Sequence, residues 1–406
     1  MESNSKIDWI GTVPENWTIL KLKYTFSNTI AGEVIDKTYW NDGEEILYTC
    51  QKTPMKSTFK AFPDYKRTGP RDILLTRNAT PYIFIPKEKS IYSNVVQKIT
   101  INSDYNLSYI RYALSSAVDS KIANGNTIPS WNMEIWSNLK LAIPQLKVQT
   151  KISTFLDKKD SEIDSVLTKT KESIEEYKWL KHAIITQAVT KGIRPNRKMK
   201  DSGNIWLGDV PSEWKIKRIK YIFRIKKDIA GKEGYTVLSI TQKGIKPKDL
   251  SKNEGQIAEN YSNYQLVNIG DFAMNHMDLL TGWVDVSKYE GVTSPDYRVF
   301  VFQKPKEYSK EYYLYFMQMC YTNKIFYGLG QGVSGMGRWR LQADKFLNFT
   351  VTVPALEEQK EIAAYLDKKC SEIDKLIEKK EQLITELETY KKSLIYEYVT
   401  GKKEVK

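Results

Sequence analysis

The 406-residue chain carries a formal charge of +13, and 41% of its residues are hydrophobic. This length and apolar content are sufficient for two or three packed domains, and the positive charge makes nucleic acid the leading class of partner. No stretch approaches the roughly 18 apolar residues of a membrane span, and the N-terminus lacks the order of a signal peptide, so we expect a cytoplasmic protein without membrane contact.

The cysteines and histidines are too few and too scattered for a structural or metal framework. Three widely spaced cysteines argue against a disulfide network. Two histidines, His182 and His276, give a zinc site almost no ligands, so we expect no metal. His182 falls in the middle of a predicted helix and is interpreted as a solvated or packing side chain.

The opening segment of the chain returns near its middle. Residues 7–26, IDWIGTVPENWTILKLKYTF, match residues 204–223, NIWLGDVPSEWKIKRIKYIF. Pro14 and Trp17 thereby correspond to Pro211 and Trp214. An internal repeat fixes the architecture before any single motif is interpreted.

A divergent region follows each opening segment and holds short alternating patterns. The first copy has ILYTCQK at 46–52 and RDILLTR at 71–77, and the second has VLSITQK at 237–243 and GDFAMNH at 270–276. We expect these to be short strands, as we do for the residues just before the second repeated segment. The divergence indicates loops that vary on a shared scaffold.

The second repeated segment predicts a long helix in each copy. Residues 143–164, IPQLKVQTKISTFLDKKDSEID, align without a gap to 353–374, VPALEEQKEIAAYLDKKCSEID, and each run ends near a glycine, Gly192 or Gly401. The spacing alternates between four and three residues, which is a heptad seam. The seam residues are Ile163, Leu167, Ile174, Tyr177, Ile184, Ile373, Ile377, Ile384, Leu387 and Leu394. Five flanking residues are expected to widen the apolar stripe: Val166, Leu180, Leu376, Leu383 and Tyr390.

Matching seams within one chain predict that the two helices pack on each other. If a two-fold axis perpendicular to the helices relates the copies, the helices run antiparallel. The bland interpretation, that each seam is simply structural core, is accepted here for the Ile and Leu positions.

This arrangement of motifs resembles the specificity subunits of type I restriction-modification systems. The resemblance covers essentially the whole chain and rests on the Gly-x-Val-Pro-x-x-Trp opening, on Pro354 to Gln359 followed by Ile362, and on the SEID pairs that end at Asp164 and Asp374. The first copy departs from the pattern, because Lys147 and Val148 replace the usual acidic pair before Gln149. The start of the first helix is therefore less well marked.

The resemblance implies an α+β fold with two globular α/β target recognition domains, separated by two long antiparallel coiled-coil helices in a pseudo-two-fold repeat. Each domain is expected to read one half of a bipartite site in double-stranded DNA, while the helices set the spacing and dock methyltransferase subunits, two in number. The expected segments are recognition domains at 1–142 and 204–352, spacer helices at 143–193 and 353–403, and a linker at 194–203.

The resemblance also implies that this chain has no catalytic site and binds no cofactor. Methylation and cleavage then belong to the methyltransferase and the restriction or translocase subunits. S-adenosylmethionine, ATP and Mg are expected on those partner subunits.

Base reading requires Arg, Lys, Asn or Gln side chains in loops that approach DNA closely. The candidates follow matching strands or lie beside glycines, and for each one a base contact, a phosphate contact and no DNA contact all stay open. They are Gln51, Lys52, Arg77, Asn78, Asn126, Thr127 and Ser130 in the first domain, and Gln242, Lys243, Asn275, His276, Gln331, Ser334, Arg338 and Arg340 in the second.

Two other functional classes are less consistent with the sequence. An enzyme that acts on DNA alone lacks its motifs: there is no phosphate-binding loop and no Asn/Asp-Pro-Pro-Tyr element. Gly330, Gly332 and Gly335 form a Gly-x-Gly-x-x-Gly pattern, but a helix-like stretch precedes it where a dinucleotide site needs a strand. A basic coiled-coil interaction protein would explain the helices but not two divergent domains.

Overall fold

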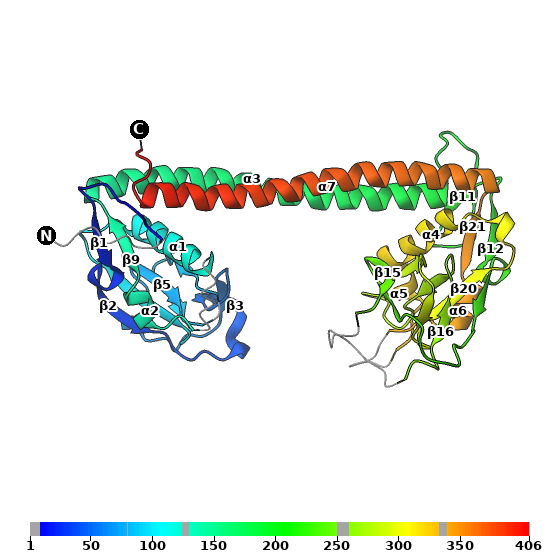
Figure 1. Ribbon diagram of the computed structural model, residues 1–406, viewed down its shortest axis with the longest axis horizontal. Helices are drawn as coiled ribbons and strands as arrows, with labels where there is room; N and C mark the ends of the chain where they lie inside the picture. Colours follow the sequence, from blue (N-terminus) through cyan, green and yellow to red (C-terminus); the bar gives the residue numbers. More distant parts are fainter. Residues whose placement is uncertain (1–8, 79, 124–129, 250–259, 333–338, 406) are drawn as a thin grey trace. The chain divides into compact units, whose positions relative to one another are not determined.

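The computed structural model describes residues 9–78, 80–123, 130–249, 260–332 and 339–405 (Figure 1). The chain forms two compact units. Unit 1 comprises Met1–Lys171 with Lys380–Lys406, and unit 2 comprises Glu172–Lys379. The two long helices, α3 (Leu146–Lys191) and α7 (Leu356–Val399), each contribute one half to each unit.

Unit 1 is built on three small sheets and two short helices. Strand β1 (Thr18–Lys21) pairs with β9 (Lys140–Ile143). A four-stranded antiparallel sheet has the order β2 (Phe26–Ala31), β8 (Val96–Ile101), β5 (Asp72–Thr76) and β6 (Ile83–Phe84), and a three-stranded sheet has the order β4 (Met55–Ser57), β3 (Trp40–Tyr48) and β7 (Ile91–Tyr92). The helices are α1 (Leu107–Ala123) and α2 (Met133–Ser137).

Unit 2 repeats this plan. Strand β12 (Lys215–Arg218) pairs with β21 (Thr350–Val353), and the four-stranded sheet has the order β13 (Phe223–Lys226), β20 (Arg298–Phe302), β17 (Phe272–Met274) and β18 (Val284–Val286). Three two-stranded pairs complete the strands: β10 (Met199–Asp201) with β11 (Asp209–Pro211), β14 (Leu238–Thr241) with β15 (Gly244–Pro247), and β16 (Gln265–Val267) with β19 (Gly291–Thr293). The short helices are α4 (Lys310–Thr322), α5 (Ile325–Gly328) and α6 (Ala343–Asn348).

A buried ion pair recurs at the start of the inner strands β5 and β17, which occupy the same place in the four-stranded sheets of the two units. Asp72 lies 3.5 Å from the Lys98 ammonium group, and Asp271 lies 2.8 Å from that of Lys226. Each carboxylate also accepts a hydrogen bond from the backbone N–H three residues earlier in the chain. These bonds satisfy charged groups that would be costly to bury alone. The repeat therefore extends into the divergent regions, although the lysine comes from a different strand in each unit.

The glutamine of the Pro-x-Leu-x-x-Gln motif ties each long helix to its domain. Gln149 is 1% exposed; its side-chain oxygen accepts from the Asn106 N–H at 2.9 Å, and its amide nitrogen donates to the Pro144 carbonyl at 2.8 Å. Gln359 makes the same two bonds, with the Ser309 N–H and the Pro354 carbonyl, at 2.9 Å each. The glutamine side chain thus joins the start of α1 to the start of α3 in unit 1, and the start of α4 to the start of α7 in unit 2.

A tyrosine on the same domain helix holds the end of the other long helix. In unit 1 the single proton of the Tyr109 hydroxyl is shared between the Ala142 carbonyl at 2.6 Å and the Val399 carbonyl at 3.2 Å. In unit 2 the Tyr312 hydroxyl donates to the Val189 carbonyl at 3.0 Å. Burial raises the pKa of both phenols, so both remain neutral donors. Gly192 and Gly401 follow with positive φ, and Trp214 and Pro14 pack where a Cβ would stand.

The seam predicted from the heptads forms within each unit, and the helices are antiparallel. In unit 1 the Phe155 ring lies 4.7 Å from that of Tyr398, and Lys391 pairs with Asp164 at 2.6 Å. In unit 2 Lys181 pairs with Asp374 at 2.7 Å. All ten predicted seam residues are buried or half-buried.

The buried part of the apolar stripe is limited to the seam itself. Each of the five flanking residues comes directly before a seam position in the sequence, and each is 40% or more exposed. They are Val166, Leu180, Leu376, Leu383 and Tyr390. Two helices packed along a single seam cover only the central knobs, so the neighbouring positions stay open to solvent. These residues adjoin the seam and widen the apolar stripe, but they are not buried in it.

Replacing Gln149 or Gln359 by leucine should lower the free energy of unfolding of its unit by about 2–3 kcal/mol. Each substitution leaves a buried backbone N–H and a carbonyl without partners. Denaturant unfolding of the full chain measures the loss, with exposed Gln382→Leu as the control. That control should change stability by less than about 0.5 kcal/mol. A loss no larger than that of the control would mean that the amide does not hold the helix start.

Candidate nucleic-acid interface

In each domain a backbone hydrogen bond joins the loop that follows β5 or β17 to a later segment of the chain. The Trp131 N–H donates to the Arg77 carbonyl at 2.8 Å in unit 1, and the Leu341 N–H donates to the His276 carbonyl at 3.0 Å in unit 2. Two of the sequence-predicted clusters therefore meet in each domain.

In the first domain the structure brings Arg77, Asn78 and Ser130 together. Asn78 and Ser130 form an isolated antiparallel bridge, and the Ser130 hydroxyl donates to the Arg77 carbonyl at 3.4 Å. Asn78 and Ser130 are exposed, and Arg77 is half-buried. Predicted residues Asn126 and Thr127 lie outside the described residues.

Gln51 and Lys52 are exposed after β3. Among the described residues, no hydrogen bond or ion pair joins them to Arg77 or Asn78. The structure thus places these two candidates on the surface of the domain without linking them to the cluster.

In the second domain Gln331 and Arg340 form the base of a loop. Their backbone groups exchange hydrogen bonds of 2.8 and 3.0 Å, and both residues are exposed. Predicted residues Ser334 and Arg338, between them in sequence, lie outside the described residues.

Gln242 and Lys243 occupy the tight turn between β14 and β15 and are exposed. The Gln242 amide donates to the Thr281 carbonyl at 3.4 Å. This contact joins the turn to the loop that follows β17.

Asn275 and His276 differ in the hydrogen bonds of their side chains. The Asn275 side-chain oxygen accepts from the Met277 N–H at 3.2 Å, so part of this side chain supports its own turn. The His276 Nδ1 is buried and has no hydrogen-bond partner in the described part of the chain. Burial lowers the pKa of His276 to about 3, with Arg298 and Arg340 adding to the effect, so the imidazole is neutral at physiological pH.

Sequence reasoning missed Arg298, which lies beneath this cluster. Its side chain donates to the Leu341 carbonyl at 2.9 Å and lies over the Phe346 ring at 4.8 Å, while Nη1 has no partner among the described residues. Only 4% of Arg298 is exposed, and burial lowers the pKa of its guanidinium to about 10. The one available signal was a basic residue at the start of the apolar strand RVFVF.

Strand register identifies the counterpart of Arg298 in the first domain as Gln97. Met274 pairs with Arg298 as Leu75 pairs with Gln97. There the Thr29 hydroxyl on β2 donates to the Gln97 side-chain oxygen at 2.7 Å, whereas β13 ends at Lys226, one residue before it would reach Arg298. The Gln97 side-chain oxygen therefore has a partner on the neighbouring strand, whereas the Arg298 Nη1 has none among the described residues.

The fold is that of a protein with two similar domains, each joined to two long helices, and comparison with known proteins gives its family. The family described as "Type I restriction modification DNA specificity domain" matches residues 14–176 and 211–389. The chain belongs to this family of type I restriction-modification specificity subunits. Such a subunit is a non-catalytic DNA-recognition component, and other subunits of the complex carry out methylation and cleavage.

Individual relatives are similar to this chain along most of its length. The type I restriction enzyme MjaVIII specificity subunit of Methanocaldococcus jannaschii is 26% identical in an alignment of 342 positions that covers 80% of this chain and 76% of the relative. A chain from a solved structure on complex assembly and conformational transition of the type I R-M system has 13% identity and a TM-score of 0.67, and the match covers 96% of this chain and 98% of that one. The HsdS subunit from Thermoanaerobacter tengcongensis has 13% identity and a TM-score of 0.48, with the same coverage.

Two further observations concern the described residues alone. Each helix in them is too short or too polar to cross a membrane. Nor do three or more His, Cys, Asp or Glu side chains gather there in a way that could hold a metal ion.

The stability of unit 2 should depend on pH through His276. The unfolded chain takes up a proton near pH 6.5, but the folded chain does not until about pH 3, so stability present above pH 6.5 is lost as the pH falls below it. Between pH 7 and pH 5 the loss should reach up to about 2 kcal/mol. Thermal unfolding followed by circular dichroism should show that His276→Asn flattens this dependence.

The matched control is His182→Asn, because His182 lies on the exposed surface of α3. Burial and the neighbouring Lys181 also lower the pKa of His182, so this variant should flatten the profile in the same direction but by less than His276→Asn does. Equal flattening by both variants, or by neither, would contradict the assignment to His276.

Proposed function

We propose that each domain reads one half of a bipartite duplex site, and that the helix pair sets the distance between the half-sites and docks two methyltransferase subunits. S-adenosylmethionine, ATP and Mg are then bound by the partner subunits. The observation that carries the reading role is the repeated backbone bond at the loop bases, Trp131 to Arg77 and Leu341 to His276.

This bond supports base reading because it holds a shared scaffold under dissimilar side chains. Exposed Asn78 and Ser130 lie at the loop base in one domain, and exposed Gln331 and Arg340 lie there in the other. Asn and Gln suit adenine edges, Arg suits guanine edges, and hydroxyls suit either. Two domains with the same frame and different side chains would read two different half-sites.

The exposed flanking residues support the docking role. Val166, Leu383 and Tyr390 belong to unit 1, and Leu180 and Leu376 belong to unit 2. All five occupy the same heptad position, so each unit presents large apolar side chains beside the seam. Such side chains exposed on a helix pair suit burial against a partner helix.

Arg338→Ala with Arg340→Ala should weaken binding at one half-site, since a lost bidentate contact costs ~1–3 kcal/mol. Binding of the full chain, with and without methyltransferase subunits, is titrated at fixed salt against duplexes altered in either half-site. Arg218→Ala with Arg224→Ala removes the same charge from exposed positions elsewhere in this domain and is the control. Unchanged binding would exclude the loop as a reader, and an equal loss on all sequences would indicate phosphate contact instead.

Inserting four helical residues after Thr170 and after Lys380 should shift the spacing between half-sites by one or two base pairs. The insertion lengthens each helix by ~6 Å and rotates the downstream part of the helix by about 40°, whereas successive base pairs rise 3.4 Å per strand. Sequencing of methylated sites gives the spacing. An insertion after Glu233, which is exposed and is not a reading candidate, is the control and should leave the spacing unchanged. Normal spacing with full activity in the helix variant would show that another part of the complex measures the distance.

A further inference from the structure

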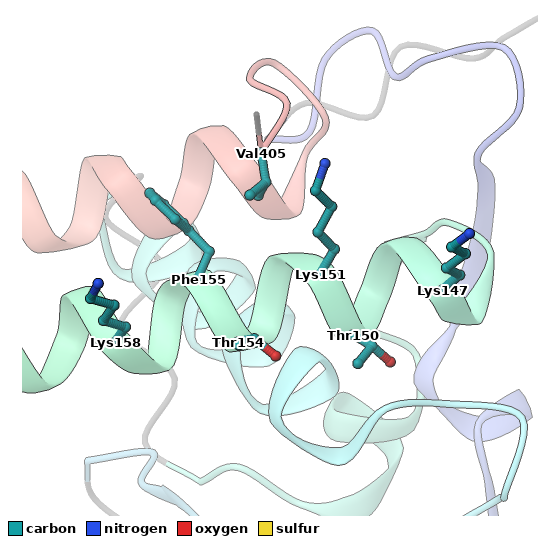
Figure 2. A pocket seen from close by; sticks show the side chains of 7 residues that line it. All are labelled: Lys147, Thr150, Lys151, Thr154, Phe155, Lys158 and Val405. Carbon is teal, nitrogen blue, oxygen red and sulfur yellow. The ribbon is translucent and has the colours of Figure 1, made fainter.

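The first turns of α3 form an open groove that lies apart from the candidate reading loops. The groove has a volume of about 670 Å³, its apolar surface comes from Phe155 and Val405, and Lys147, Lys151 and Lys158 line it (Figure 2). All five residues belong to unit 1. In the described part of the chain these three lysines form no ion pair, and Glu404, next to Val405, is exposed and pairs with none of them.

At the matching place in the second copy, the chain continues past residue 195 and pairs with the start of its long helix. Tyr365, the counterpart of Phe155, lines a cavity of only about 180 Å³ together with residues of the segment 192–195. Arg194 in this segment pairs with Glu361 at 2.7 Å, and Arg197 just beyond it pairs with buried Glu358. The start of α7 is thus covered by a peptide segment whose arginines pair with the glutamates of the helix.

The sign of the groove is reversed in the first copy. Lys147 and Lys151 stand at the positions of Glu357 and Glu361, and Val148 stands at that of Glu358. Lysines four residues apart repel each other, and a lysine in the first turn of a helix opposes the helix dipole. Acidic residues open α7, whereas α3 has none in its first turn. An anionic occupant would offset both unfavourable terms.

We propose that this groove in unit 1 docks an acidic segment of a partner protein. The segment presents carboxylates to Lys147, Lys151 and Lys158 and an apolar side chain to Phe155 and Val405. A peptide is favoured over a nucleic acid because Phe155 and Val405 give the groove an apolar surface, and because a peptide segment pairs with the charged side chain at the matching helix position of the second copy. This inference does not depend on half-site reading by the loops.

The test uses the full chain and two labelled probe peptides of about four helical turns. One peptide carries glutamate and leucine at amphipathic spacing, and the other carries lysine in place of each glutamate. Fluorescence anisotropy at fixed salt measures their affinities for the wild type and for Lys147→Glu with Lys151→Glu, which takes the residues of the second copy. Lys169→Glu with Lys171→Glu makes the same charge change at exposed positions further along α3 and is the matched control.

The acidic peptide should lose at least about tenfold in affinity for the groove variant and less than about twofold for the control. The lysine peptide should bind the groove variant more tightly than the wild type. Equal losses in both variants would show attraction to general charge and would overturn the proposal, as would no loss in either.

A short DNA duplex serves as a competitor probe and distinguishes the other polyanion. If duplex affinity falls in the groove variant by the same factor as peptide affinity, the groove contacts nucleic acid and the proposal is wrong. Thermal unfolding of every variant, with Phe155→Ser as a second groove variant of unchanged charge, separates loss of the groove from loss of the fold. A correctly folded Phe155→Ser chain that binds the acidic peptide as the wild type does would also overturn it.

Discussion

One constraint shapes both units: a single short helix in each domain holds the start of one long helix and the end of the other. In unit 1 the α1 segment receives the Gln149 side chain at its N-terminus, and Tyr109, three residues further on, reaches Val399. In unit 2 the α4 segment does the same with Gln359 and Val189. Because the partners are buried backbone groups, any displacement of one helix relative to the other would leave hydrogen-bonding groups unsatisfied. The antiparallel seam therefore depends on these buried bonds as well as on its apolar knobs.

This constraint explains why the loops can diverge while the frame is retained. The ties to the long helices lie on one side of α1 and α4, and the four-stranded sheet is anchored by the pairs of Asp72 with Lys98 and of Asp271 with Lys226. Residues after β5 and β17 contribute only backbone groups to the bond that joins the loop bases. Their side chains are consequently free to change without loss of that bond. Even a buried position in the sheet changes chemistry, from Gln97 to Arg298, where the neighbouring strand is shorter.

The sequence predicted the parts of the fold that periodicity encodes. The heptads located the seam, because apolar spacing is a local property of the chain. The repeated segments revealed the two copies, and the antiparallel direction followed only if a two-fold axis relates them. The exposure of Val166 and Leu383 was not predictable, since it depends on how many helices cover the stripe. Likewise Gln149 was recognised as a motif residue, but its structural role comes from a hydrogen bond with the Asn106 N–H, and Asn106 is more than forty positions away in the sequence. Arg298 was missed for the same reason: its burial and its missing partner depend on strand lengths elsewhere.

The departure from the family pattern at Val148 has a physical explanation in the second copy. There the buried Glu358 carboxylate accepts from the Trp214 indole at 3.0 Å and pairs with Arg197, whose side chain is 9% exposed. A carboxylate at this depth is tolerated only with such partners. In the first copy Trp17 takes the place of Trp214, but Val148 is half-buried against an apolar cluster and no arginine pairs in the described groove. A glutamate at Val148 would lack the guanidinium that makes Glu358 acceptable. In the second copy a segment with two arginines covers the helix start, and no arginine segment pairs there in the described part of the first copy. This one difference accounts for both the loss of the acidic pair and the presence of lysines in the open groove.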